Sequence, residues 1–166
     1  MATTTVSTDQ IAAWLEHVTD PEIPVLTIMD MGIVRSIDIE DSGAVKIDLT
    51  PTYSGCPAMQ TIEKEIIQCL NNHGIEEVTV KEVLHPAWTT DWLTEKGKQK
   101  LEEYGIAPPE EQSADKNLLM GEPKQVKCPH CKSQNTEMIS QFGSTACKSL
   151  YKCLDCLEPF DYFKCI

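Results

Sequence analysis

Two short cysteine pairs near the C-terminus decide the fold of that part of the chain: Cys-Pro-His-Cys at 128–131 and Cys-Leu-Asp-Cys at 153–156. A Cys-x-x-Cys turn directs two thiolates to one ion, and Zn²⁺ prefers a closed tetrahedron of such soft ligands. Twenty-one residues separate the pairs, enough for a hairpin between the two turns. The spacing therefore predicts a zinc ribbon over residues 124–166, with four ligands: Cys128, Cys131, Cys153 and Cys156.

A closed set of four thiolates indicates a structural ion, because no coordination position stays open for a substrate. About forty residues rarely bury enough apolar surface to fold unaided, so the ion would supply the missing stability. His130 is expected to point to solvent. Cys147 and Cys165 stay open: either could replace a ligand or remain free beside the site.

Two other uses of the cysteines are less consistent with the sequence. The chain has eight Cys, which in an exported protein would suggest a disulfide framework. Redox-active Cys-x-x-Cys pairs need a strand before them and a long helix after them, and neither flank has that pattern. The opening stretch, MATTTVSTDQ, does not resemble a signal peptide, and no apolar run is long enough for a membrane helix. The cytoplasm is the expected location.

The charge is unevenly spread along the chain. The 166 residues carry a net −12, but residues 124–166 carry six Lys and four acidic residues, hence +2. The other 123 residues carry eight basic and 22 acidic side chains, hence −14. This strongly acidic part of the chain is expected to repel phosphate backbones. The charge therefore argues against nucleic acid as a partner and against a zinc ribbon of the transcription-factor type.

The pattern before the ribbon predicts an α+β domain over residues 1–106. A capping box at Ser7 and Gln10 begins a helix, and a loop with two prolines follows at 19–31. Strands are predicted at about 33–39, 45–49 and 77–84, with a helix after Pro57 and a last helix ending near Gly105 that carries Trp88 and Trp92 on one face. The order α-β-β-α-β-α indicates a small layer sandwich, and the composition of residues 107–123 predicts a linker.

Cys56 stands out in the first domain because Pro57 follows it and helical periodicity begins at once. Proline favours the first helical position, which puts Cys56 at or next to the N-cap. There the helix dipole and free N–H groups are expected to favour the thiolate. Gly55 leaves room on the preceding side, and Thr52 is among nearby hydroxyls that could donate to a thiolate or to sulfide. The alternative is a buried cysteine that only fills space, as we also expect for Cys69 on the apolar face of the helix.

Other polar candidates are weaker. Asp20, Glu22 and Asp30 could form an acidic cluster, although loop carboxylates are usually solvated or cap a helix. The sequence has no glycine-rich phosphate loop, no nucleophilic Ser–His arrangement and no HExxH pair. We therefore expect no independent enzyme.

Several short motifs resemble those of the small iron–sulfur cluster assembly family. They are Asp-Pro-Glu-Ile-Pro at 20–24, Asp-Met-Gly-Ile-Val at 30–34, Thr-Pro-Thr-Tyr-Ser-Gly-Cys-Pro at 50–57 and His-Pro-Ala-Trp-Thr at 85–89. The resemblance implies that Cys56 is the reactive cysteine and that Asp20 and Glu22 form the family's acidic loop. Met31 stands where the family usually has leucine, which is a conservative change.

The tail resembles the C-terminal extension of the branch of this family that acts in phenylacetate degradation. The similar segments are Phe-Gly-Ser-Thr-Ala-Cys-Lys at 142–148, the pair at 153–156, and Glu-Pro-Phe-Asp-Tyr-Phe-Lys-Cys at 158–165. Members of that branch are encoded with the multicomponent phenylacetyl-CoA 1,2-epoxidase. The resemblance implies a role in building or repairing the iron–sulfur cluster of the epoxidase's reductase component.

Two functions follow as hypotheses. A maturation factor would hold iron, sulfur or a cluster transiently on Cys56 and deliver it to the reductase. Since one Cys cannot hold a cluster alone, a homodimer, or a second Cys from the client or from the tail (Cys147 or Cys165), is required. The second hypothesis is a non-catalytic structural subunit of the epoxidase, which could contact the other components through the acidic domain and the ribbon.

Overall fold

Strand β2 (Val45–Leu49) is the central strand of the first sheet, and its residues alternate between two environments. Val45, Ile47 and Leu49 are buried, whereas Lys46 between them is exposed. This period of two is what a strand with one covered face requires. β1 (Val34–Ile39) pairs with β2 in antiparallel register and β3 (Val78–Glu82) in parallel register, which gives the order β1-β2-β3.

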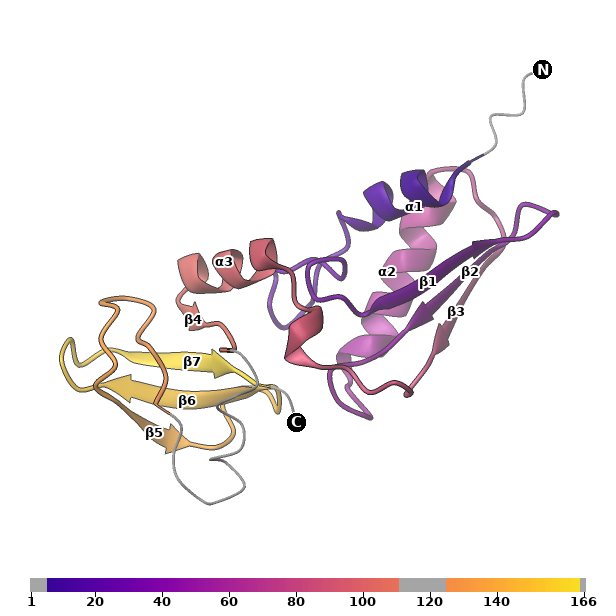
Figure 1. Cartoon of the computed structure of the whole chain (residues 1–166). Helices are drawn as coiled ribbons and strands as arrows, with labels where there is room; N and C mark the ends of the chain where they lie inside the picture. Colours follow the sequence, from indigo (N-terminus) through magenta and orange to yellow (C-terminus); the bar gives the residue numbers. More distant parts are fainter. Residues whose placement is uncertain (1–5, 111–124, 165–166) are drawn as a thin grey trace. The chain divides into compact units, whose positions relative to one another are not determined.

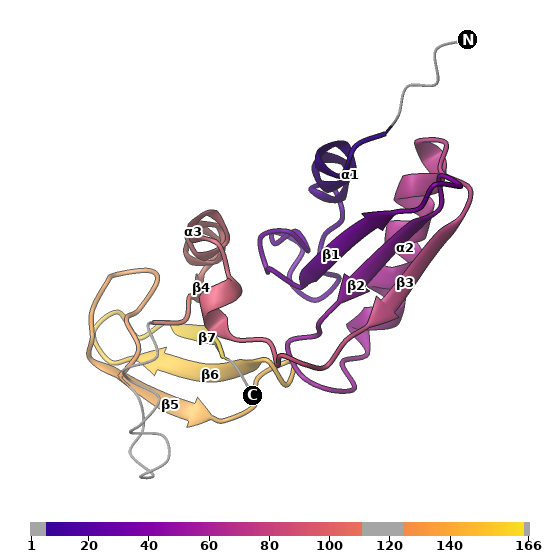
Figure 2. The same cartoon turned by 45° about the vertical axis from the view of Figure 1, so that its right-hand side comes forward.

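Helix α2 (Ala58–Asn72) covers one face of this sheet (Figure 1). Its apolar residues recur every three or four positions, and Met59, Ile62, Ile66 and Leu70 are all buried. Because β2 and β3 are parallel, the chain must cross from one end of the sheet to the other between them, and α2 makes that crossing. The turned view shows the same two layers from a second side (Figure 2).

Helix α1 (Thr8–Leu15) begins with the capping box that the sequence predicts. The Ser7 hydroxyl accepts from the Gln10 amide at 3.2 Å, and the Ser7 amide donates to the Gln10 side chain at 3.0 Å. The inward face of α1 buries Ile11 and Leu15 completely. The cap fixes where the helix starts, and the two apolar side chains fix which face it buries.

The predicted last helix is wrong in its first half. Residues 85–89 are not helical, Thr90–Trp92 forms a short 3₁₀ turn (η1), and α3 runs only from Glu95 to Tyr104. The Thr94 hydroxyl accepts from the Gly97 amide at 3.0 Å and so sets the start of α3 at Glu95. Trp88 and Trp92 therefore do not share a helical face; Trp88 is buried and its indole N–H donates to the Met31 carbonyl at 2.8 Å.

The structure, a computed structural model, describes residues 6–110 and 125–164 and divides the chain into two compact units, Met1–Trp88 and Thr89–Ile166. Helix α3, which the sequence pattern assigns to the first domain, belongs to the second unit. The predicted limits of 1–106, 107–123 and 124–166 stay a prediction, because most of the predicted linker and Cys165 lie outside the described residues.

The second unit contains a four-stranded sheet in the order β4-β7-β6-β5. Its strands are β4 (Ile106–Ala107), β5 (Thr136–Ser140), β6 (Lys148–Cys153) and β7 (Pro159–Phe163). The last three form an antiparallel meander, and β4 adds to β7 in parallel. The core beneath the sheet packs aromatic rings beside two cysteines; it comprises Ala107, Val126, Cys128, Tyr151, Cys153, Phe160 and Tyr162.

The helices of the described residues, 6–110 and 125–164, are all too short or too polar to cross a bilayer. The observed architecture is thus a small α+β unit followed by a sheet-based unit that carries the two cysteine pairs.

Candidate metal centre and cysteine loop

The four cysteines of the two Cys-x-x-Cys pairs come together at one end of the second sheet. The Sγ atoms of Cys128, Cys131, Cys153 and Cys156 all lie within 4.8 Å of one another. Two contacts are closer: 3.8 Å between Cys128 and Cys156, and 3.5 Å between Cys131 and Cys153. Zinc–sulfur bonds of about 2.3 Å in a tetrahedron place sulfurs about 3.8 Å apart, so this group has the dimensions of a four-thiolate zinc site.

The backbone shapes both pairs in the same way. Lys132 and Leu157, the residues that directly follow the second Cys of each pair, have φ of 66° and 67°. This left-handed turn reverses the chain after each pair and lets both sulfurs of a pair face the same point. The Cys128 amide donates to the Ser133 carbonyl at 2.8 Å, and the Cys153 amide to the Glu158 carbonyl at 3.0 Å, which closes each turn.

The thiols are not equivalent as acids. Hydrogen bonds from the Cys156 and Asp155 amides, helped by neighbouring thiols and opposed by burial, lower the pKa of Cys153 to about 7. The Glu158 amide also favours the Cys156 thiolate, but burial and the hydrogen bonds with Cys153, Cys131 and Cys128 outweigh it and raise the pKa of Cys156 to about 12. Four thiolates so close together need a cation among them.

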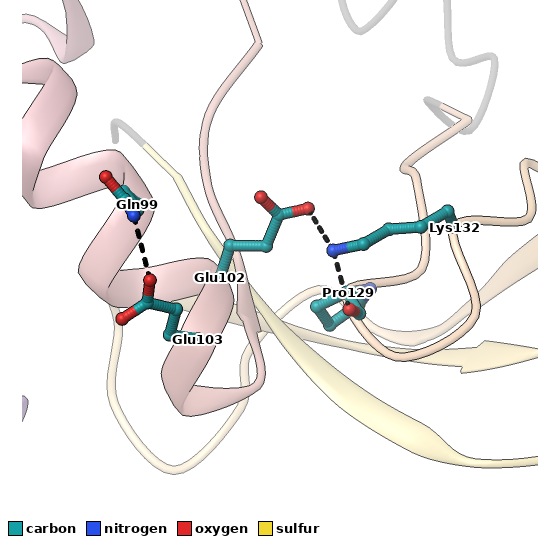
Figure 3. Close-up of polar contacts among 5 residues, drawn as sticks. All are labelled: Gln99, Glu102, Glu103, Pro129 and Lys132. Carbon is teal, nitrogen blue, oxygen red and sulfur yellow. Dashed lines mark hydrogen bonds and ion pairs between the residues drawn. The ribbon is translucent and has the colours of Figure 1, made fainter.

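Polar side chains around the sulfurs connect the two turns to each other and to α3. Asp155 in the second turn accepts from the Ser133 hydroxyl and from the Asn135 amide group, the latter at 2.8 Å, and both bonds lower the pKa of Asp155. In the first turn, the Lys132 ammonium pairs with Glu102 of α3 and donates to the Pro129 carbonyl at 2.9 Å (Figure 3). Lys132 and Asp155 are not among the predicted site residues, although their places beside and within the cysteine pairs are a usable signal.

His130 lies outside the cysteine group, as expected, and packs against the end of α3. A Cβ built on Gly105 would lie 3.2 Å from the His130 ring carbon Cε1. Gly105 itself has φ of 91° and ends α3 in the left-handed conformation. The close approach of α3 to the first cysteine pair thus depends on a residue without a side chain.

We predict that Gly105→Ala destabilises the second unit by about 1–2 kcal/mol through the left-handed backbone, with a further cost from the contact with His130. Faster hydrogen exchange of the β6 amides is the measurement, and the zinc content should not change because no sulfur is touched. Gly74→Ala is the matched control, since Gly74 has φ of 87° but nothing within 4 Å of its Cβ position. Equal destabilisation by the two variants, each measured in its own sheet, would contradict a role for the His130 contact.

Cys56 lies directly before α2, as the sequence indicates. Pro57 is the N-cap residue of this helix, and the Cys56 carbonyl accepts from the Met59 amide at 3.2 Å. Gly55 has φ of 77°, with nothing within 4 Å of its Cβ position, so the chain turns sharply just before the cysteine. The Cys56 side chain is partly buried, neither fully exposed nor enclosed in the core.

The expectation that the Cys56 thiolate is favoured is wrong for the free protein. Burial raises the pKa of Cys56 above its ordinary value, and the carboxylates of Glu22 and Asp20 add to the increase. The Ala58 amide and the Tyr53 hydroxyl hydrogen-bond to the sulfur and lower the pKa, but they do not compensate. The position in the sequence indicates the favourable helix start, whereas the opposing burial and carboxylates come from tertiary packing.

The acidic loop has a structural task besides its charge. Asp20 is buried, and its Oδ1 accepts from the amides of Glu22 at 2.7 Å and Ile23 at 2.8 Å. Asp30 similarly accepts from the Thr27 amide at 3.2 Å. Both carboxylates therefore cap backbone turns, which is close to the capping role that is usual for loop carboxylates. Their loop nevertheless lies close enough to Cys56 for the charges of Asp20 and Glu22 to act on its thiol.

The remaining predicted site residues are spread over both units. Thr52 is buried in the loop before Cys56, and Thr50 beside it is 1% exposed with a hydroxyl oxygen that has no hydrogen-bond partner. Cys69 is half-buried instead of fully packed, and its Sγ lies 3.5 Å from the Trp14 carbonyl. Cys147 is buried in the second unit, 3.1 Å from the Thr145 hydroxyl, and is not part of the four-cysteine group.

We predict that the pKa of Cys56 shifts in opposite directions in two variants. Glu22→Gln removes a negative charge that disfavours the thiolate, so the pKa falls; Tyr53→Phe removes a donor that favours the thiolate, so the pKa rises further. The pH dependence of iodoacetamide alkylation at Cys56, followed by peptide mass spectrometry, measures both. Shifts of the same sign in the two variants would show that the assigned interactions do not control the thiol.

The two units match two known protein families. Residues 8–84 match the family described as iron-sulfur cluster assembly protein, and residues 112–164 match the PaaD zinc beta ribbon domain. Among solved structures, the domain of unknown function DUF59 from Bacillus anthracis is 27% identical with a TM-score of 0.53, and the similarity covers 56% of this chain and 89% of that one. The class is therefore an iron–sulfur assembly domain joined to a zinc ribbon.

Relatives narrow the class further. An Escherichia coli K12 protein, provisionally named as a component of 1,2-phenylacetyl-CoA epoxidase, is 50% identical over 157 residues, covering 95% of this chain and 92% of the relative. A Bacillus subtilis Fe-S protein maturation auxiliary factor is 32% identical over 94 residues, covering 56% of this chain and 91% of the relative. The chain belongs to the PaaD family, the branch of the iron–sulfur assembly proteins that carries this ribbon.

Proposed function

We propose that this protein is an accessory factor that assembles, delivers or repairs the iron–sulfur cluster of the reductase component of phenylacetyl-CoA epoxidase. The observation that carries the proposal is the presence, in one chain, of an iron–sulfur assembly domain with Cys56 at the start of α2 and a ribbon of the PaaD type. The E. coli relative's name supports the link to the epoxidase, and the B. subtilis relative's name supports the maturation role.

The surroundings of Cys56 suit transient binding of iron. The raised pKa keeps the thiol protonated and less reactive toward oxidants at neutral pH. The carboxylates of Asp20 and Glu22, which disfavour the thiolate, attract a ferrous cation, and an arriving cation removes that penalty. The Cys56 thiol releases its proton to water as the cation binds, and the Tyr53 hydroxyl and the Ala58 amide stabilise the resulting thiolate. Iron and sulfide are cargo in this proposal, and a homodimer or a client cysteine completes the ligand set.

The ribbon is proposed to hold a structural zinc ion through Cys128, Cys131, Cys153 and Cys156. The ion would cross-link the two turns at the end of the second sheet. With all four positions taken by thiolates, the site has no place for substrate, and we propose no catalytic site in the chain. The ribbon is the part we assign to recognition of the epoxidase components. The cytoplasm is the proposed location, where free thiols such as Cys56 and Cys147 stay reduced.

A second function, a non-catalytic structural subunit of the epoxidase, is favoured by the E. coli relative's name. The two functions differ in whether the assembled epoxidase still needs this protein. A maturation factor becomes dispensable once the reductase holds its cluster, whereas a structural subunit is needed in every active complex.

The deciding experiment produces the reductase in cells with and without this protein and measures iron and sulfide per reductase. Under the maturation proposal, the cluster content falls without the protein, and epoxidase reconstituted from cluster-replete reductase is active without it. Full cluster occupancy in its absence would overturn the proposal. Activity that still requires the protein after the cluster is complete would establish the structural role instead.

A further inference from the structure

A groove in the first unit lies apart from Cys56. It runs between the tip of the β1–β2 hairpin and the segment that joins α2 to β3, two segments that lie near each other in Figures 1 and 2. Its volume is about 630 Å³. Cys56 precedes the first turn of α2 and the groove follows the last turn, so a helix of about 20 Å separates them.

The floor of the groove is apolar. Val45 is buried and Ile75 is 7% exposed, while Ile39 at the end of β1 is 37% exposed and offers a free apolar surface. Two glycines, Gly43 and Gly74, border the groove with positive φ, and nothing lies within 4 Å of either Cβ position. The groove therefore has room for an apolar side chain of about the size of Leu.

The rim of the groove is acidic. Asp41, Glu76 and Glu77 line it and are exposed, and within residues 6–110 and 125–164 no cation pairs with any of the three carboxylates. Lys46, the nearby basic residue, is already held by Glu40 at 2.5 Å. The unit as a whole is acidic, with four basic and fourteen acidic residues in 1–88, hence −10. The negative electrostatic potential at the rim is thus not neutralised by basic residues of the same unit.

We propose that this groove binds a short basic segment of a partner protein, with one apolar side chain on the Ile39–Ile75 floor and flanking Lys or Arg side chains on the rim. Charge complementarity selects this occupant, because the exposed carboxylates repel acidic segments and nucleic acid. A small cation would satisfy the carboxylates but would leave the apolar floor uncovered, whereas a segment with an apolar side chain covers both. The proposal goes beyond the assembly role, since it assigns a docking surface that leaves Cys56 accessible.

The test uses the full ¹⁵N-labelled chain and amide chemical shifts. The probe is the peptide acetyl-Lys-Leu-Arg-Ile-Lys-amide; the comparison peptides are acetyl-Lys-Ser-Arg-Ser-Lys-amide, which lacks the apolar residues, and acetyl-Glu-Leu-Glu-Ile-Glu-amide, which inverts the charge. We expect saturable shifts confined to residues 39–45 and 74–77 with the first peptide, weaker binding of the second and none of the third. Rising salt should weaken the binding.

Two matched triple variants separate the groove from general acidity. Asp41→Asn/Glu76→Gln/Glu77→Gln is expected to weaken binding about tenfold, because each exposed ion pair contributes modestly. Glu63→Gln/Glu65→Gln/Glu82→Gln removes the same charge from exposed positions outside the groove and should leave the affinity nearly unchanged. Equal weakening by both variants, shifts spread over the unit, or equal binding of the Ser-containing peptide would overturn the proposal.

Discussion

Cys153→Ser is expected to reduce the zinc content from about one equivalent per chain to near zero, and to unfold the sheet of the second unit. Cys153 is fully buried, its sulfur lies 3.5 Å from that of Cys131, and it belongs to the core that includes Tyr151 and Phe160. Serine offers a hard hydroxyl that binds zinc poorly, so the ion loses one of four ligands.

The effect on stability is large because binding energy and folding energy are the same quantity here. Structural zinc supplies about 10–16 kcal/mol of binding free energy in small zinc-binding peptides. This is as large as, or larger than, the whole free energy of unfolding of a typical small domain. Zinc is measured by elemental analysis of the purified chain, and folding by hydrogen exchange of the β6 and β7 amides. The first unit should keep its protection, since none of its residues belongs to the cysteine group.

Cys147→Ser is the matched control for the zinc prediction. Cys147 is 5% exposed and lies in the same unit, but it is not in the four-cysteine group. The same chemical change there should leave the zinc in place. Loss of metal from Cys147→Ser together with retention by Cys153→Ser would overturn the ligand assignment and make Cys147 a ligand.

Cys56→Ser is expected to reduce the cluster content of the reductase to the level found without this protein. Serine keeps the volume and the backbone turn at the start of α2 but loses the thiolate that iron prefers. The cluster content is measured as iron and sulfide per reductase after co-production with the variant. Hydrogen exchange of the α2 amides should match that of the unchanged protein, which would show that the fold survives.

Cys69→Ser gives the comparison for the Cys56 variant. Cys69 is also partly buried and lies within α2, the helix that Cys56 precedes. Its Sγ lies 3.5 Å from the Trp14 carbonyl oxygen, to which a serine hydroxyl could donate equally well. We expect full cluster content with this variant. Loss of cluster content with Cys69→Ser, or full cluster content with Cys56→Ser, would show that Cys56 does not carry the proposed function.

Local pattern predicts most elements of the first unit. The alternation of Val45, Ile47 and Leu49 and the capping box at Ser7 are short-range signals, and the structure contains the strand and the helix that they indicate. Residues 85–94 are harder to predict because the spacing of Trp88 and Trp92 imitates a helix, whereas the Thr94 cap starts α3 only at Glu95. The Trp88 indole instead bonds to Met31, a contact 57 residues away in sequence that no local pattern indicates.

The candidate sites divide in the same way. The pairs at 128–131 and 153–156 are recognisable in the sequence, because two thiols separated by two residues can reach one ion, and the structure brings all four sulfurs together. The acidity of Cys56 could not be predicted from its place before α2. Its pKa depends on burial and on Asp20 and Glu22, which come from a loop more than thirty positions away.

Sequence alone thus determined most elements of the first unit, the two cysteine pairs and the place of Cys56 before a helix. Tertiary structure alone decided that α3 and β4 join the second unit, that Lys132 pairs with Glu102, and that Asp41, Glu76 and Glu77 border one groove. The physical reason is range: propensity and spacing act over a few residues, whereas burial, charge and packing depend on distant segments that meet only in the folded chain.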